Sequence, residues 1–412
     1  MPDESQVSLS QRLRPGLWAL RTRRDSSALS SAVRGIFDIR HSAGSTLEHL
    51  KATLRWLCAA QDATGGRGVA AFYDLRTGEW GPPYPETTGY IIPTFIDYAH
   101  FSGDMRFTQR GVRMADWLLE LQLESGAFPI GPLWPEWEPQ PIIFDTGQIL
   151  QGLVRAMRET GQERYLHAAV RAGDWLIQVQ DPDGCWRQFT TQGIAHAYNA
   201  RTAWALLELG TVSGHPRHQR AGKLNLDWTL EQQDEDGWFE GMSFRSGEKP
   251  LTHTIAYTIE GVLEGGLLLG DNKLVASAAW AAESLRNRLD SRGMLPGRFG
   301  RGWEPHATWT CPTGTAQMAR LWLRLAGCTG NDLYLAAGQA ANHYLKQRQA
   351  RRSRHQGVAG GLPGSYPVYH EYEPFRHLNW AAKFFADSLM VEAQIDAGHS
   401  VERDPAVSPA GE

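Results

Sequence analysis

The chain has 412 residues, of which 42% are hydrophobic and 21% are charged, as in an ordinary globular protein. Its formal net charge of −4 gives no support to a nucleic-acid partner. Its four cysteines form no CxxC pair, so a disulfide framework is not expected and a reducing compartment fits. No apolar stretch approaches the roughly 18 residues of a membrane span, and no secretory signal opens the chain. We therefore predict a cytoplasmic protein without a transmembrane segment.

The chain divides into three parts in order. Residues 1–45 form an N-terminal arm in which residues 12–24 combine leucine, tryptophan and five arginines. This segment could make a weak contact with an anionic membrane or a partner, or the arm could simply lie on the body of the protein. Residues 46–397 carry a repeated pattern, and residues 398–412 are rich in proline, serine and acidic residues, which predicts a disordered tail.

The repeat is a pair of helices, found six times. The first helix of each pair has apolar residues at three- and four-residue spacing and a polar opposite face, which predicts an outer position. These helices span 46–61, 107–123, 164–180, 219–233, 272–289 and 332–349. The second helix is apolar on most sides, which predicts burial on most sides. These span 87–101, 143–160, 197–210, 253–269, 312–327 and 378–395.

A glycine-containing turn joins the two helices of each pair, often after glutamine and before an aromatic residue. The six glycines, spaced by 60, 58, 53, 56 and 68 residues, are Gly66, Gly126, Gly184, Gly237, Gly293 and Gly361. Glycine provides the positive φ that ends a helix. Hairpins of this kind are stable only beside their neighbours. The sequence therefore predicts an all-α (α/α)6 toroid with an inner and an outer ring of helices.

The turns and the starts of the inner helices should meet at one mouth of such a ring, where polar residues would face a cleft. His253, Tyr257, Glu260 and Glu264 are spaced to share one face of an otherwise apolar helix, and buried Glu is costly without a partner or a wet cavity. Residues proposed to bind substrate are Tyr90, Trp134, Trp137, Gln148, Asn199, Glu260, His306, Trp309, Tyr366, Asn379 and Lys383. A structural ion pair between Lys383 and Asp387 is an equally good interpretation.

Two kinds of catalysis fit these residues. Glycoside hydrolysis needs two carboxylates, and Glu86 and Asp145 lie 59 residues apart, about one repeat, at the starts of adjacent inner helices. Glu136 and Glu260 are alternative candidates for the two catalytic carboxylates, and Asp145 could instead be a simple helix cap.

Elimination or C5 epimerisation of a uronic acid needs a Tyr or His base and a group that neutralises the carboxylate. His196, Tyr198, Asn199, Arg201, His253 and Tyr257 offer those types on two adjacent inner helices. No cofactor is expected. A zinc site from His306, Cys311, His370 and His377 is less well supported, because no paired-ligand motif accompanies them.

Several stretches resemble an uncharacterised bacterial family encoded with polysaccharide-biosynthesis genes. They include PETTGYIIPTF (85–95), FDTGQILQGL (144–153), HAYNARTAWALLELG (196–210), LTHTIAYTIEGVLE (251–264) and NWAAKFFADSL (379–389). The turns resemble the Gln…Gly…Trp repeats of squalene-type cyclases and, more loosely, those of six-hairpin glycosidases. The resemblance implies a glycosidase-like toroid connected with glycan synthesis or processing.

We therefore expect a carbohydrate-active enzyme whose substrate is an oligosaccharide or polysaccharide, containing uronic acid. Hydrolysis and elimination or epimerisation stay open. A non-catalytic glycan-binding protein of a polysaccharide assembly system and a terpenoid-cyclase-like enzyme are the alternatives from other classes. The terpenoid alternative lacks a DxDD-type acidic cluster, since the nearest acidic runs, DPDG and DEDG, lie in the repeat turns.

Overall fold

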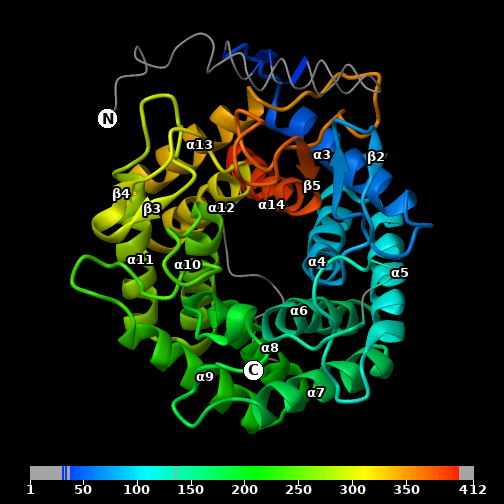
Figure 1. Ribbon diagram of the computed structural model, residues 1–412, viewed down its shortest axis with the longest axis vertical. Coiled ribbons are helices and arrows are strands. Elements are labelled where there is room, and N and C mark those ends of the chain that lie inside the picture. Colours follow the sequence, from blue (N-terminus) through cyan, green and yellow to red (C-terminus); the bar gives the residue numbers. More distant parts are fainter. Residues whose placement is uncertain (1–29, 32, 35–37, 135, 137, 399–412) are drawn as a thin grey trace.

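The computed structural model describes residues 30–31, 33–34, 38–134, 136 and 138–398, and these contain twelve α-helices in two concentric rings (Figure 1). The outer ring comprises α3 (Thr46–Asp62), α5 (Arg106–Leu121), α7 (Glu163–Gln178), α9 (Pro216–Glu231), α11 (Asn272–Arg286) and α13 (Asp332–Lys346). The inner ring comprises α4 (Pro85–Ser102), α6 (Ile143–Thr160), α8 (Ala200–Ser213), α10 (Thr252–Leu269), α12 (Pro312–Thr329) and α14 (Asn379–Asp396). The predicted (α/α)6 toroid is confirmed.

The burial of the helices follows their apolar pattern. In the inner helix α10 every residue from Thr252 to Gly266 is buried, whereas the outer helix α5 buries only five residues of one face. An amphipathic helix removes apolar surface from water on one face only, so it lies in the outer ring. A helix that is apolar on most sides lies in the inner ring, between neighbouring helices.

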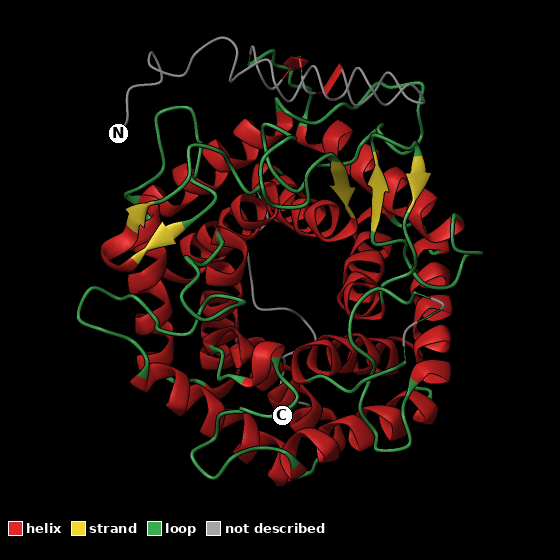
Figure 2. Cartoon of the chain, in the orientation of Figure 1, coloured by secondary structure: helices red, strands yellow, loops and turns green. Residues whose placement is uncertain are grey.

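The two ends of the ring differ in the length of their connections, as Figure 2 shows by the loops of the ribbon. Inner helices pass to the next outer helix through connections of two or three residues that begin with a left-handed glycine, as at Gly103 and Gly161. A long connection joins each outer helix to the inner helix of the same pair. All the strands of the described residues lie in these long connections. The starts of all six inner helices therefore lie at the long-connection end.

Five of the six long connections are fastened to the next outer helix by a glutamine, whereas residues 287–311, between α11 and α12, contain none. The side-chain amide of Gln122 donates to the carbonyl of Gly126 in its own turn and to that of Ala168 in α7. Gln180 and Gln233 repeat this arrangement with the following outer helices, and Gln61 does so with Arg110 of α5. We call this repeated pair of bonds the glutamine clamp.

The last turn closes the ring on the first hairpin. Gln349 donates to Gly360 O and to Thr53 Oγ1 of α3, both at 2.7 Å. The left-handed residue in this turn is Gly360, with φ +94°, and not Gly361 as the spacing predicted, whereas the other five glycines have positive φ as expected. A Cβ at Gly360 would lie 2.1 Å from Ala52 O, so the turn touches the backbone of α3.

A small sheet makes a second closure. Strand β1 (Phe72–Asp74) pairs with β2 (Glu79–Trp80) of its own connection and with β5 (Arg376–Leu378) of the last, both antiparallel. Strands β3 (Phe299–Gly300) and β4 (Glu304–Pro305) form a separate hairpin. The first and last repeats are thus joined by backbone hydrogen bonds as well as by helix packing.

Glycines let the inner helices approach each other closely. A Cβ at Gly261 of α10 would lie 2.3 Å from the backbone of Ala200, the first residue of α8, and one at Gly152 of α6 would lie 2.3 Å from Gly89 O of α4. Gly314 of α12 meets His253 in the same way. The narrow inner ring depends on these residues, because a methyl group cannot be accommodated against a fixed backbone.

The part of the N-terminal arm that is described lies against the last hairpin. Asp38 pairs with Arg348 at 2.9 Å, and the backbone N–H of His41 donates to Gln347 O. The predicted membrane or partner contact through residues 12–24 lies outside the described residues. Among the helices that are described, none combines the length and the apolar character needed to cross a bilayer.

Replacing Gly261 by alanine should destabilise the fold. The gain in helix propensity of about 0.5–1 kcal/mol is smaller than the cost of forcing a methyl group into the backbone of α8, so we expect a net loss of about 1–3 kcal/mol in urea unfolding. The matched control is Gly111→Ala in the outer helix α5, where the nearest atom to the new Cβ is 3.5 Å away. That variant should be as stable as the parent or more stable. Equal effects of the two substitutions would contradict the proposed close packing.

Candidate active site at the starts of the inner helices

Two buried carboxyl groups lie at the starts of neighbouring inner helices. Glu86 is the second residue of α4 and Asp145 the third of α6, and the two helices pack directly on each other through Gly89 and Gly152. Their exposed fractions are 6% and 4%. Asp145 Oδ2 accepts a hydrogen bond from the backbone N–H of Gly131 at 2.8 Å. The charge of Asp145 raises the pKa of Glu86, so the two carboxyl groups are near enough to interact.

Burial sets the protonation of this pair. It raises the pKa of Glu86 well above the usual range, and the nearby charge of Asp145 raises it further, while the Tyr84 phenol and Arg201 act in the opposite direction. Burial raises the pKa of Asp145 to about 7, although the backbone N–H groups of Gly131 and Asp145 itself favour its ionised form. Near neutral pH the site therefore holds one protonated carboxyl and one close to half ionised.

Arg201 is held at the centre of a polar network. It is almost completely buried and forms an ion pair with Glu260, while its Nε donates to Gln148 Oε1 at 2.9 Å and one terminal nitrogen to Gln151 Oε1 at 3.2 Å. Glu260 also pairs with Arg320 of α12 at 2.8 Å. The polar face predicted on α10 is thus balanced by arginines of its neighbours on both sides. Arg201 can orient the site and supply a positive field, but all three of its nitrogens already have partners.

Aromatic rings surround Arg201 and the first turns of the inner helices. The Arg201 Cζ atom lies 5.0 Å from the ring centroid of Tyr257 and 5.4 Å from that of Phe384. Phe144 lies 4.9 Å from Tyr257 and 5.2 Å from Tyr198 between ring centroids. Flat apolar faces next to polar groups suit the stacking of a sugar ring.

Four buried amide side chains at or near the starts of inner helices have unused hydrogen-bonding atoms, and one of them is Asn379, whose Oδ1 has no partner among the described residues. Gln148 Nε2, Gln317 Nε2 and both polar side-chain atoms of Asn199 find no hydrogen-bond partner among the described residues. Each lies at or near the start of an inner helix, in α6, α12 and just before α8. A buried amide without a partner costs free energy, which a bound polar ligand would recover.

The predicted bases for proton abstraction are poorly suited to that role. His253 Nδ1 lies 2.7 Å from Gln317 Oε1, and burial lowers the His253 pKa to about 3. Burial and the charge of Glu86 raise the pKa of Tyr257 well above its usual value. Burial likewise raises the pKa of Tyr198 well above its usual value. A neutral, weakly basic imidazole and firmly protonated phenols favour donation of hydrogen bonds over removal of a proton.

Other predicted site residues have structural partners. Both ring nitrogens of His196 lie within hydrogen-bond distance of backbone carbonyls, those of Ser243 and Thr191. The Asn379 amide donates to Ala70 O and Thr87 Oγ1, which joins α14 to the first connection. Lys383 pairs with Asp387 at 2.6 Å, as the structural interpretation predicted. Tyr90 packs beneath the site against Phe384, 5.4 Å between ring centroids.

The remaining predicted binding residues do not join this cluster. Trp134 and Glu136 are exposed in the long connection before α6, His306 is exposed beside β4, and Trp137 lies outside the described residues. Trp309 stacks on His370, 6.0 Å away. Tyr366 lies beside Arg348, near the N-terminal arm. Exposure and loop position, which the helical pattern does not reveal, separate these residues from the inner ring.

The four residues considered for zinc are not brought together in the described part of the chain. The one group of possible metal ligands found there is Asp181, Asp183 and Cys185 in a repeat turn. Arg187 pairs with both of those carboxylates, at 3.0 and 2.7 Å. That group is explained by the ion pairs of the turn.

Sequence reasoning missed Gln151, Gln317 and Arg320. A signal for the last two was present, because Gln317, Arg320 and Arg324 recur at three- and four-residue spacing on a largely apolar helix. It is the same kind of pattern as the polar face of α10, and the two faces meet.

Comparisons with known proteins agree with the toroid. Residues 127–263 match the family model for the squalene-hopene cyclase C-terminal domain. The squalene–hopene cyclase of Zymomonas mobilis is 25% identical over 276 residues, and the ent-copalyl diphosphate synthase of Streptomyces sp. strain KO-3988 is 38% identical over 80 residues. The matches cover 60% and 19% of this chain, but only 39% and 15% of those proteins.

The similarity in structure extends over much more of the chain. The unsaturated glucuronyl hydrolase of Bacillus sp. GL1, described as responsible for the degradation of glycosaminoglycan, superposes with a TM-score of 0.66 at 16% identity. The match covers 87% of this chain and all of that one. The expected resemblance to six-hairpin glycosidases and to cyclase-like toroids is therefore confirmed at the level of the fold.

The raised pKa of Asp145 predicts a specific pH dependence of stability. Below the ordinary value of 3.8, the carboxyl is protonated in both the folded and the unfolded chain. As the pH rises to about 7, the unfolded chain ionises first, so the stability contributed by the protonated carboxyl is lost. Asp145→Asn keeps the acceptor for Gly131 without a charge. It should exceed the parent in stability by up to roughly 4 kcal/mol at pH 8 and by little at pH 3.

The measurement is urea unfolding of parent and variant at both pH values. Asp62→Asn, at an exposed position of α3, is the control and should change stability by less than about 0.5 kcal/mol at either pH. A gain from Asp145→Asn that does not grow with pH would contradict burial of an ionisable carboxyl at this position.

Proposed function

We propose that the protein is a carbohydrate-active enzyme that hydrolyses a glycosidic bond in a bacterial glycan, with an acidic sugar at the bond that is cut. The observation that carries the proposal is the pair of buried carboxyl groups, Glu86 and Asp145, with raised pKa at the starts of adjacent inner helices. Hydrolysis of a glycoside needs one carboxyl that donates a proton and one carboxylate on the other side of the bond.

The environments of the two residues suggest how the roles divide. Glu86 has no backbone donor acting to lower its pKa, so it stays protonated and serves as the acid that protonates the leaving oxygen. Asp145 receives two backbone N–H groups, so it ionises first and serves as the base or nucleophile. Two carboxyls whose surroundings separate their protonation are the arrangement expected of an acid and base pair.

Substrate binding would use the groups that lack partners. Asn199, Gln148 and Gln317 can donate to sugar hydroxyl or carboxylate oxygens, and the rings of Phe144 and Tyr257 offer faces for stacking. Arg201 adds a positive field next to Glu86, which favours an acidic sugar. The similarity in fold to an unsaturated glucuronyl hydrolase supports the same substrate class.

Elimination or C5 epimerisation is the less well supported reaction. It requires Tyr257, Tyr198 or His253 to remove a proton, and their pKa shifts run against that role. A terpenoid-cyclase-like function is the second candidate, favoured by the match of residues 127–263 and by the aromatic rings around Arg201. The unpartnered amides and the arginine–glutamate network speak against a purely apolar substrate.

The proposal predicts which variants lose activity. Uronate-containing oligosaccharides should yield new reducing ends with the parent protein, and matched neutral oligosaccharides should yield fewer. Glu86→Gln and Asp145→Asn should each reduce turnover by roughly 100-fold or more, because each removes one proton-transfer group. The surface variant Asp62→Asn should keep full activity.

Other products would overturn the hydrolase assignment. An ultraviolet-absorbing unsaturated uronate, lost in Tyr257→Phe but retained in Glu86→Gln, would indicate elimination. Saturable glycan binding without turnover of any substrate would indicate a non-catalytic binding protein. Conversion of a long isoprenoid to a cyclic product, with no effect on glycans, would establish the cyclase alternative.

A further inference from the structure

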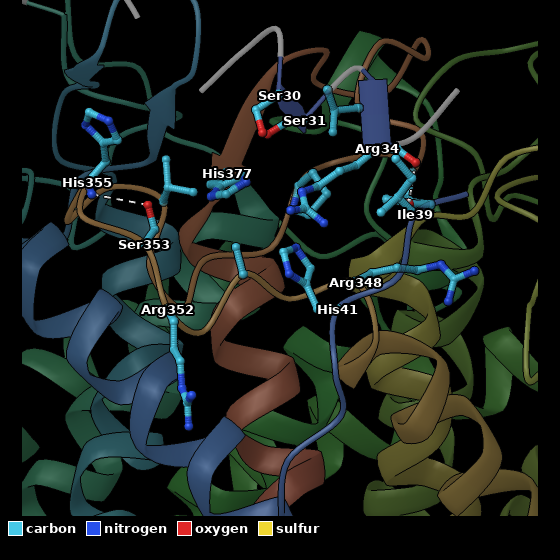
Figure 3. Close-up of a pocket in the computed structure, with 15 residues that line it drawn as sticks. Ser30, Ser31, Arg34, Ile39, His41, Arg348, Arg352, Ser353, His355 and His377 are labelled. Carbon is cyan, nitrogen blue, oxygen red and sulfur yellow. Dashed lines mark hydrogen bonds between the residues drawn. The ribbon is translucent and has the colours of Figure 1, made fainter. Parts of the chain in front are cut away.

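A second pocket lies away from the carboxyl pair, between the N-terminal arm and the last long connection (Figure 3). It has a volume of about 210 Å3. One wall comes from Ser30, Ser31, Arg34, Ile39 and His41 of the arm, and the other comes from lining residues between Arg348 and His377. Neither Glu86 nor Asp145 reaches it.

The lining of this pocket is basic. Arg34, Arg348, Arg352, His41, His355 and His377 line it together with three serines, and none of its fifteen lining residues is Asp or Glu. Figure 3 shows Arg34 extending from the arm towards the last connection, with His41 close to it, whereas Arg352 points away. Asp38, which is not a lining residue, pairs with Arg348.

Two buried polar atoms of the lining have no partner. Arg348 is 8% exposed; two of its nitrogens donate, to Tyr344 O and Asp38 Oδ1, but its Nε has no hydrogen-bond partner among the described residues. His377 is 5% exposed and its Nδ1 has none either. The Nε–H of Arg348 is a buried donor that a bound acceptor could pair with. The neutral His377 ring uses its one N–H on the carbonyl of Gly357, so its Nδ1 is an acceptor.

Two imidazoles of the pocket, those of His41 and His377, have lowered pKa values and therefore favour the neutral form. Burial, with Arg34 and Arg351 adding to it, lowers the pKa of His41, and burial lowers that of His377 to about 4. Such groups do not compete with an anion for the arginines. An anion placed between them would gain charge-assisted hydrogen bonds from Arg34 and neutral ones from the His41 imidazole and the serine groups.

We propose that this pocket binds a phosphate group. Guanidinium groups match the oxygens of phosphate, and a tetrahedral anion can accept from donors on both walls at once. The volume corresponds to about seven water molecules at ~30 Å3 each, which exceeds one phosphate and leaves room for one sugar-sized group. The ligand chemistry is therefore inorganic phosphate or the phosphate of a sugar phosphate, and the site is independent of the reaction proposed for Glu86 and Asp145.

The test is calorimetric titration of the full chain with inorganic phosphate and with glucose 1-phosphate, at constant ionic strength and with chloride as the blank. Saturable binding at one site is expected. Tighter binding of glucose 1-phosphate would assign the pocket to a sugar phosphate, and equal or tighter binding of inorganic phosphate would assign it to the free ion. Arg34→Gln should weaken the binding at least tenfold, and Arg354→Gln, an exposed arginine of the same connection outside the lining, should bind like the parent.

The melting temperature of Arg34→Gln shows whether this variant folds. If it does not fold, a second measurement on the parent protein tests the proposal. Bound phosphate should raise the pKa of His41, followed by NMR of the imidazole signals, because the anion offsets the field of Arg34 and Arg351. Absence of binding above the chloride blank would overturn the proposal. So would an unchanged affinity in a folded Arg34→Gln variant or an unchanged pKa of His41.

Discussion

The glutamine clamp is the interaction on which the ring depends. A helical hairpin is stable only beside its neighbours, so its position must be fixed by contacts with the next hairpin. In five of the six turns a glutamine makes such a contact. Gln122 illustrates the solution, with one amide group that bonds both its own turn and α7. Gln349 applies the same device across the seam, where the sixth turn meets α3 of the first hairpin. The open end of a helical repeat is thereby replaced by a closed circle.

Closure also explains where polar groups can be buried at low cost. The long connections lie at one end only, so the first turns of all six inner helices meet there with their unused backbone N–H groups. The N–H of Gly131 reaches Asp145 from such a connection, whereas Glu86 in the neighbouring helix receives no comparable bond. The same ring thus gives two similar carboxyls different tendencies to ionise, which is the property that acid–base chemistry needs.

The fold could be predicted because pairs of helices joined by a glycine-containing turn recur at regular intervals along the sequence. Helix bounds such as 143–160 agree with α6, and the 59-residue separation of Glu86 and Asp145 correctly placed them in corresponding positions. The hydrogen-bond and ion-pair partners of the buried polar side chains could not be predicted. Arg201 is bonded by Gln148, Gln151 and Glu260, which belong to two other helices, and only packing brings them together.

Two residues at the junction of the first and last hairpins make contacts that the sequence pattern did not reveal. Asn379 looked like a cavity residue by its spacing, yet it bonds to Ala70 some three hundred positions earlier, across the seam of the ring. Gly361 fitted the period, but the neighbouring Gly360 has the left-handed conformation because it touches Ala52 of the first hairpin. Both residues lie where the first and last hairpins meet, which is where a local pattern carries least information.

The central claim is that the ring holds a carboxyl pair in two different protonation states, and carbon-13 NMR of the labelled side-chain carboxyl groups of Asp and Glu tests it most directly. In a titration of the parent protein, with Asp145→Asn and Glu86→Gln to assign the signals, Asp145 should titrate near pH 7 and Glu86 should stay protonated at that pH. Titration of both residues near their ordinary values would contradict the account, because it would mean that neither carboxyl is buried in the folded ring.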